Sequence, residues 1–315
     1  MASEDMVAGW VFLAPAAIIF MVFIFGPIFY SLWISFYERN SFGTINEFVG
    51  IENYRRILDS RDFWNAFRNT AWFSLGVVPT QTAIGLILAV LANRKIRGKT
   101  FFRTAFYFPS ISSSVVISLI FLWIYQRNGL VDILFNSLNI PLPNPVWMQN
   151  PNGIIEMTLG SLGVDSVPIW LRGPSIALLS IMLLNIWTTA GTMMVIFLAG
   201  LQDIPTDVYE AASLDGASRV RQFTDITVPL LRPVILFVVT LGTIGTFQVF
   251  DQIFVMTSDG GPARTTTTLV YLIYQEGFKF GQGPGYASAL ATILFGIIFV
   301  LFLVQRHFLG QTENR

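Results

Sequence analysis

The sequence predicts an all-α integral membrane protein with six transmembrane helices, and three observations support this fold class. Charged residues make up 12% of the 315 residues, about half of the roughly 25% found in soluble domains. Hydrophobic residues make up 53% of the chain, and phenylalanine alone occurs 29 times. Six apolar runs are long enough to cross a bilayer core, which takes about 20 helical residues. So few charges could not cover the surface of a soluble domain.

The charge balance and the absence of cysteine exclude several classes of protein. The 19 basic residues are matched by 19 acidic ones, so there is no basic excess to neutralise nucleic-acid phosphates. The apolar content is far too high for an intrinsically disordered chain. Because the chain has no cysteine, it can form neither disulfides nor thiolate metal sites.

The predicted spans are runs almost free of charge. The first is expected to stay in the protein as a helix, because it is too long for the apolar part of a signal peptide and no basic residue precedes it. The predicted membrane cores lie near residues 12–35, 70–92, 105–125, 174–200, 233–256 and 286–305.

A further uncharged run, Ile133–Ile155, is predicted to lie outside the membrane. It contains four prolines, so a helix there could not keep its hydrogen bonds, and lipid offers no replacement partners. We therefore expect an extended external loop over residues 126–172. The whole chain, residues 1–315, is expected to form a single transmembrane domain.

The orientation is predicted from the basic residues. Five of them, and no acid, lie between Arg94 and Arg103, which assigns this connector to the cytoplasm. With six spans, both termini would then be cytoplasmic. The total count separates the two sides weakly, with ten basic residues inside and nine outside. The outer loop 38–68 carries five of those nine, together with five acids.

The connector between the fourth and fifth spans, residues 202–232, carries the signals of a short helix. Pro205 suits the first helical position, and Gly216 is the expected stop about three turns later. Asp207 and Glu210 lie near the positive end of that helix. An interfacial helix lying on the membrane is the alternative, although residues 206–217 lack large apolar anchors.

Two blocks of the sequence resemble a known family. Glu210–Ala217, with an isoleucine and prolines after it, resembles the EAA loop of permeases in binding-protein-dependent ABC importers; Gly216 follows Ala212 by four residues, as in that signature. Val228 stands where a leucine is usual. Phe250–Thr257, followed by Gly-Gly-Pro at 260–262, resembles the maltose-type sugar permeases, with one residue more than the common form. The resemblance runs from the first span to Arg306.

The resemblance implies a type I ABC importer permease fold in a bacterial or archaeal cell membrane, with a coupling helix at about 205–216. Such a helix sits in a groove of a cytoplasmic ATPase and transmits its motion to the membrane helices. The implied partners are a second related permease, two copies of the ATPase, which bind ATP and Mg²⁺, and an external solute-binding protein. This chain is expected to hold no cofactor or metal. The implied coupling residues are Tyr209, Glu210, Ala211, Ala212, Asp215 and Gly216.

Polar residues inside the fourth and fifth spans are candidate substrate contacts, because polar groups are costly in a membrane. Spacings of i, i+3 and i+4 place several of them on shared helix faces, and aromatic neighbours, including Phe250, could cover the apolar face of a sugar. The resemblance places a sugar site between these two spans. The alternative is that the threonines join neighbouring helices and that Asp251 reaches water. The candidates are Asn185, Trp187, Thr188, Thr189, Thr192, Thr246, Phe247, Gln248 and Asp251.

Two other motifs are rejected. Gly98-Lys99-Thr100 is not a phosphate-binding loop, because Asn93 stands where the motif needs its first glycine. His307 is the only histidine, so the chain cannot provide a two-histidine metal site.

The sequence therefore favours the transmembrane subunit of an ATP-driven importer for a sugar or sugar-like solute, delivered by an external binding protein and moved by alternating access. An ion-gradient transporter acting alone is the alternative, but Asp251 is its only candidate ionisable residue in mid-membrane. A membrane enzyme lacks a convincing acid, base or metal set. Which sugar, polyol or glycerol phosphate ester is carried stays open.

Overall fold

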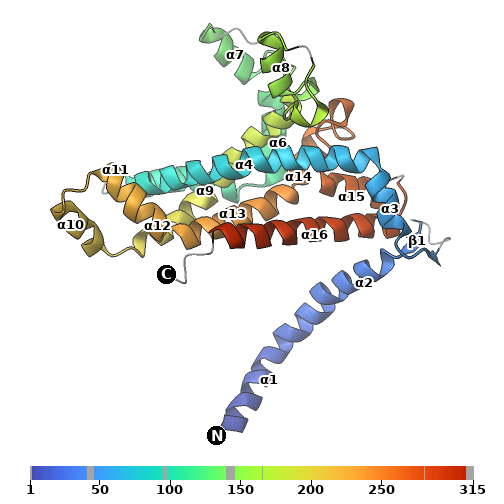
Figure 1. Cartoon of the computed structure of the whole chain (residues 1–315), viewed down its shortest axis with the longest axis horizontal. Helices are drawn as coiled ribbons and strands as arrows, with labels where there is room; N and C mark the ends of the chain where they lie inside the picture. Colours follow the sequence, from blue (N-terminus) through green and yellow to red (C-terminus); the bar gives the residue numbers. More distant parts are fainter. Residues whose placement is uncertain are drawn as a thin grey trace. The chain divides into compact units, whose positions relative to one another are not determined.

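Figure 1 shows the computed structural model, in which residues 2–40, 46–94, 98–139, 146–164, 166–279 and 281–309 are described. The chain divides into two compact units, one of residues 1–63 with 272–296 and one of residues 64–271 with 297–315. Lys95 and Arg97 of the basic connector, and three of the four prolines in the run Ile133–Ile155, lie outside the described residues.

The first unit combines one long apolar helical segment with a small hairpin. The buried Asn53 side chain donates hydrogen bonds to the carbonyl oxygens of Ser35 (2.9 Å) and Tyr37 (3.0 Å), which fixes the hairpin against α3. Its elements are α1 (Ala2–Phe20), the π-helical turn η1 (Met21–Phe25), α2 (Gly26–Ile34), the antiparallel strands β1 (Tyr37–Arg39) and β2 (Asn46–Phe48), α3 (Glu52–Asp59), most of α15 (Leu269–Phe278) and the first half of α16 (Pro284–Leu309).

The second unit is a helical bundle that contains the rest of the chain. Its elements are α4 (Arg61–Asn93), α5 (Lys99–Ile111), α6 (Ser114–Ile124), α7 (Leu130–Ser137), η2 (Trp147–Gln149), α8 (Ile154–Ser161), η3 (Ile169–Leu171), α9 (Ile176–Gln202), α10 (Thr206–Leu214), α11 (Arg219–Gln222), η4 (Phe223–Thr227), α12 (Val228–Leu230), α13 (Arg232–Phe247), α14 (Asp251–Met256), η5 (Pro262–Arg264) and the second half of α16.

The apolar core of the second unit lies where α4, α9 and α13 meet. Phe197 and Met194 of α9 are fully buried there, and Leu231, just before α13, is 1% exposed. Beside this core, Arg103 of α5 donates a hydrogen bond to the carbonyl oxygen of Ala92 (3.1 Å), so a cation satisfies one of the last acceptors of α4.

Five helical segments among the described residues are long and apolar enough to cross a membrane, and a bent pair can supply a sixth. They correspond to the predicted spans, although α4 and α16 extend beyond the predicted membrane cores. The five segments are Trp10–Ile34, Arg61–Asn93, Ile176–Gln202, Arg232–Met256 and Pro284–Leu309.

The third predicted span, 105–125, is not one straight helix. It consists of α5 and α6, whose axes meet at 96°. Ser112 and Ser113 between them are extended, with ψ angles of 152° and 126°. Pro109 removes one backbone donor from the last turn of α5, and serine side chains compete with helical hydrogen bonds, which explains a break at this position. The fifth span also breaks, between α13 and α14.

The segment 126–172, predicted to be an external loop, contains short helices among its described residues. Within the run predicted to be a loop, α7 forms a helix of eight residues, too short to span a membrane. Trp147 donates a hydrogen bond to Asp132 of α7 (3.0 Å), and Glu156 of α8 pairs with Arg172 (3.5 Å). The sequence analysis missed α7 because the prolines that follow it led to the prediction of a loop for the whole run.

Substitution of Gly191 by alanine is expected to destabilise the second unit by about 1–3 kcal/mol, because overpacking a tight contact forces the backbone apart. A Cβ atom at Gly191 of α9 would collide with the carbonyl oxygen of Phe106 and lie 2.9 Å from the Cα atom of Tyr107, both in α5. Thermal unfolding of the purified chain in detergent measures the change.

Gly296→Ala is the matched control, since a Cβ atom there would have no neighbour within 4 Å. It should leave the unfolding temperature unchanged or raise it slightly. Equal behaviour of the two variants would show that α5 and α9 are not packed this closely.

Candidate functional site

The helix α10 is held at the surface and buries none of its side chains in this chain. Pro205, predicted at the first helical position, is instead the N-cap residue, with an extended ψ of 138°. The helix therefore begins at Thr206, one residue later than predicted. At the other end, Gly216 has a φ of +76°, and its N–H donates to the carbonyl oxygen of Ser213 (3.1 Å). The Ala217 N–H donates to the carbonyl oxygen of Ala212 (2.9 Å), which completes a Schellman motif.

The six predicted coupling residues do not all face the same way. Tyr209 is partly covered, and its hydroxyl is hydrogen-bonded to Thr227 (2.9 Å). Glu210, Ala211, Asp215 and Gly216 are exposed, and Ala212 is partly exposed. Figure 1 shows α10 at the left end of the second unit, beyond the ends of α4, α9 and α13.

Two exposed apolar side chains, one at the end of α10 and one in α11, were not among the predicted coupling residues. Leu214, the last residue of α10, is 89% exposed, and Val220 of α11 is 72% exposed. An apolar side chain outside the membrane-spanning segments gains free energy if a partner covers it. The sequence already showed an apolar residue, Leu214, two positions before Gly216, but the resemblance to the family motif did not include it among the coupling residues.

Six of the nine predicted substrate residues divide between two adjacent polar pockets. Asn185, Gln248 and Asp251 line a pocket of about 200 Å³, together with the backbone break that follows α13. Thr188, Thr189 and Thr192 line another of about 150 Å³. Gln252 lines both, so the two pockets meet at this side chain.

Serines from the break in the third span complete the second pocket and were missed by the sequence analysis. Ser110, Ser112 and Ser114 line it, and Ser114 donates a hydrogen bond to the Asp251 carboxylate (2.5 Å). This contact joins the first residues of α6 and α14, the two half-helices that begin after the breaks. A run of serines after a proline in an apolar segment was the available signal.

Three of the predicted substrate residues lie elsewhere. Trp187 packs against Phe121, with ring centroids 5.5 Å apart and the ring planes tilted by 45°, and lines an apolar pocket of about 420 Å³. Phe247 lines another apolar pocket, of about 480 Å³. Thr246 is buried and donates to the Ser74 hydroxyl of α4 (2.9 Å). Neighbours in a helix are rotated by about 100° from one residue to the next, so these side chains leave the face of Gln248.

Two threonine hydroxyls of α9 already make hydrogen bonds within the bundle. Thr188 and Thr189 both donate to the carbonyl oxygen of Asn185, at 2.9 and 2.7 Å. Thr189 also lies 2.5 Å from the side-chain oxygen of Gln81, a buried amide of α4 that the sequence analysis did not single out. By contrast, no hydrogen bond to the Asn185 amide occurs among the described residues.

Comparison with known proteins places this arrangement in a family. The profile of the family described as "binding-protein-dependent transport system inner membrane component" matches residues 81–309. The chain belongs to this family. The match includes α10, both polar pockets and the breaks in the third and fifth spans. It makes the chain a multi-pass membrane permease, and it counts against a transporter that works alone on an ion gradient.

The permease is similar over nearly its whole length to permeases of sugar transport systems. It is 35% identical to the lactose transport system permease LacF of Rhizobium radiobacter, over 95% of this chain and 93% of that protein. It is 31% identical to the trehalose/maltose permease MalF of Thermococcus litoralis, over 94% and 92%. A chain of a bacterial ABC transporter for alginate import has the same fold, with a TM-score of 0.76, 20% identity and 99% of each chain covered.

Replacing Asn69 and Asn185 in turn by alanine is expected to show which side-chain amide stabilises the fold and which only lines a pocket. Asn69 of α4 is 4% exposed and donates to the carbonyl oxygens of Arg264 (3.1 Å) and Thr267 (3.0 Å). Asn69→Ala should therefore lower the free energy of unfolding by about 1–3 kcal/mol, because it leaves buried acceptors without donors. Asn185→Ala should lower it by much less, as judged by thermal unfolding of the purified permease. Equal losses would mean that Asn185 is structural.

Proposed function

We propose that this permease forms the translocation pathway of an ATP-driven importer that takes up a sugar or sugar-like solute from an external binding protein. ATP and Mg²⁺ would be bound by two copies of a separate ATPase, and a second related permease would complete the pathway. The chain itself is a transport subunit, to which we assign no catalytic step.

The observation that carries this proposal is the exposed α10. A short helix that buries nothing in its own chain, but is fixed at its end by a Schellman motif, presents a rigid surface to another protein. Glu210, Ala211, Asp215 and Gly216 offer small or charged groups there, and Leu214 adds an apolar contact. These properties suit a groove in a partner protein.

The two polar pockets support the choice of solute. Asn185, Gln248 and Gln252 offer amide donors and acceptors, Asp251 offers a carboxylate, and Phe250 adds an aromatic ring to the lining. Hydroxyl-rich solutes need such convergent partners, whereas an apolar solute would leave them unpaired. The named relatives carry lactose or trehalose and maltose, which is the same class of solute.

The orientation follows from the same proposal. If α10 meets a cytoplasmic ATPase, then the connector between α4 and α5 also lies on the cytoplasmic side, because two spans separate the two connectors. Arg103 of α5 lies next to the end of α4 there. The N- and C-terminal ends of the chain would lie on that side as well. The folded loop 126–172 would then face outwards, where the binding protein delivers its solute.

Glu210→Trp tests the role of α10. A bulky ring on this exposed surface should prevent docking in a groove, because interface residues near the centre of a contact contribute disproportionately. Solute uptake per ATP hydrolysed should fall by roughly tenfold in proteoliposomes that contain the complete transporter, while the amount of inserted permease stays the same.

Asp203→Trp is the control, because it adds the same ring at an exposed acid that follows α9 and precedes α10. It should leave uptake close to that of the parent. Full uptake by the Glu210→Trp transporter would count against docking through α10.

A further inference from the structure

A closed set of hydrogen bonds joins α10 to the segment that follows it. The Gln222 amide nitrogen donates to the Ser213 hydroxyl (2.9 Å), which donates to the carbonyl oxygen of Tyr209 (2.7 Å). The Tyr209 hydroxyl lies 2.9 Å from the Thr227 hydroxyl, which donates to the carbonyl oxygen of Gln222 (3.3 Å). With Tyr209 as donor to Thr227, every group donates in one direction around the ring. We call these four residues the Gln222 ring.

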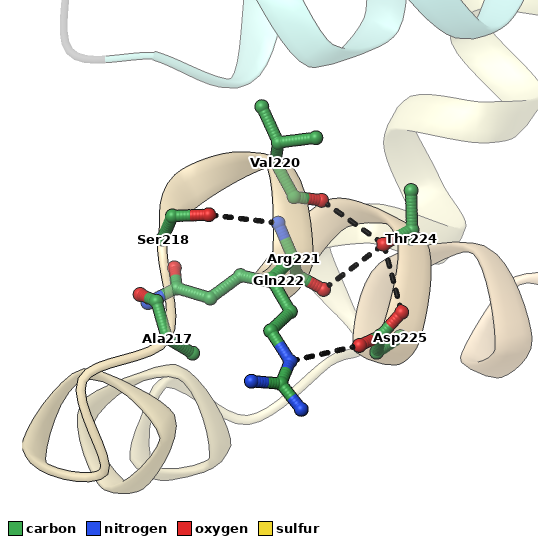
Figure 2. Close-up of polar contacts among 7 residues, drawn as sticks. All are labelled: Ala217, Ser218, Val220, Arg221, Gln222, Thr224 and Asp225. Atoms are coloured by element: carbon green, nitrogen blue, oxygen red, sulfur yellow. Dashed lines mark hydrogen bonds and ion pairs between the residues drawn. The ribbon is translucent and has the colours of Figure 1, made fainter.

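The covalent connection between α10 and α11 is the turn through Gly216, where an added Cβ atom would meet no other atom within 4 Å. Gln222 spans this turn, because its amide also donates to the carbonyl oxygen of Ala217 (3.2 Å). Figure 2 shows the Gln222 side chain directed towards Ala217.

The far side of the Gln222 ring is anchored in the bundle. Thr227 is 5% exposed and ends the π-helical turn η4, which leads through α12 to α13. Leu231, between α12 and α13, is 1% exposed and packs in the core with Phe197 and Leu201 of α9. The ring therefore connects α10, which has no buried side chain, to η4, whose Thr227 is buried.

We propose that Gln222 is a positioning residue that locks α10 to α11–α13, so that residues 206–247 move as one rigid arm. A displacement of α10 by a partner then shifts α13 and the break that follows it, instead of bending the Gly216 turn. The connection to transport rests on the function proposed above; the rigidity of the arm does not. Because a rigid element transmits motion that a loose loop would absorb, the Gln222 ring sets how much of the motion of α10 reaches the membrane helices.

A second polar contact in the same short helix provides a matched control. Arg221 pairs with Asp225 (3.3 Å), but both side chains are largely exposed and the pair stays within α11 and η4. Figure 2 shows the Arg221 side chain directed towards Asp225. Such exposed pairs contribute little stability, and this one does not connect α10 to anything.

Distance measurements on the purified full-length permease test the rigidity of the arm. The chain has no cysteine, so spin labels can be placed at Asp207→Cys in α10 and Phe237→Cys in α13, both exposed positions. The parent should give a narrow distance distribution. Gln222→Ala should broaden it, because it removes both hydrogen bonds that the Gln222 amide donates. The loss of one ordinary hydrogen bond already shifts the ratio of tied to untied forms by roughly fivefold.

Three further variants make the test specific. Ser213→Ala should broaden the distribution in the same way, Gln222→Lys should keep it narrow because lysine retains N–H donors, and Asp225→Ala should leave it unchanged. A distribution as narrow in Gln222→Ala as in the parent would overturn the proposal. So would broadening by Asp225→Ala.

Uptake per ATP hydrolysed by the complete transporter, in proteoliposomes, tests the consequence. It should fall in Gln222→Ala, recover in Gln222→Lys and stay at the parent value in Asp225→Ala. Unchanged uptake per ATP in a variant whose arm is loose would overturn the positioning role. If the arm loosens as expected but no ATPase ever associates with the permease, the proposed function fails and the rigid arm stands.

Discussion

The helix α10 has no buried side chain to hold it, and much of the account depends on how it is nevertheless fixed. Most helices in proteins are stabilised by packing an apolar face rather than by their intrinsic propensity. Here the backbone hydrogen bonds of the Gly216 turn and the Gln222 ring replace that packing. This arrangement leaves Leu214 and Glu210 free for another surface, while the helix keeps a defined position.

A second constraint governs the membrane-spanning part, where backbone groups without partners are costly. Irregular backbone is tolerated inside a membrane only where protein or a water-filled cavity satisfies it. Both breaks meet this condition: Ser112 lies at the edge of one polar pocket, and Val249 and Phe250 line the other. The Ser114–Asp251 contact then connects the two half-helices. The polar pockets and the breaks are thus two aspects of one structural solution.

The sequence predicted best those features that depend on local rules. Hydropathy located the spans, and the proline and glycine near the ends of α10 located that helix to within a residue or two. The family resemblance is confirmed by the family match. The coupling role that the resemblance implies for α10 stays a prediction. These rules act over a few residues, so one sequence is enough to apply them.

Side-chain direction and three-dimensional partners could not be predicted in the same way. Trp187 follows Asn185 by two residues, yet it lines a different pocket, because α9 is packed on several sides. Thr246 donates a hydrogen bond to Ser74, which lies 172 residues away in the sequence, so this partner could not be predicted from the spacing within its own helix. The break at Ser112 was not predicted, because the residues around it are so apolar that the segment was interpreted as one continuous span. Gln81, which accepts a hydrogen bond from Thr189, was missed for the same reason.

The most direct test of the central claim is the accessibility of α10 from the two sides of the membrane. The cysteine-free chain allows a single Leu214→Cys label site at a side chain that is 89% exposed. A membrane-impermeant maleimide should label it only from the cytoplasmic side, and the bound ATPase should protect it. Labelling from outside the cell, or labelling that the ATPase does not change, would contradict the account.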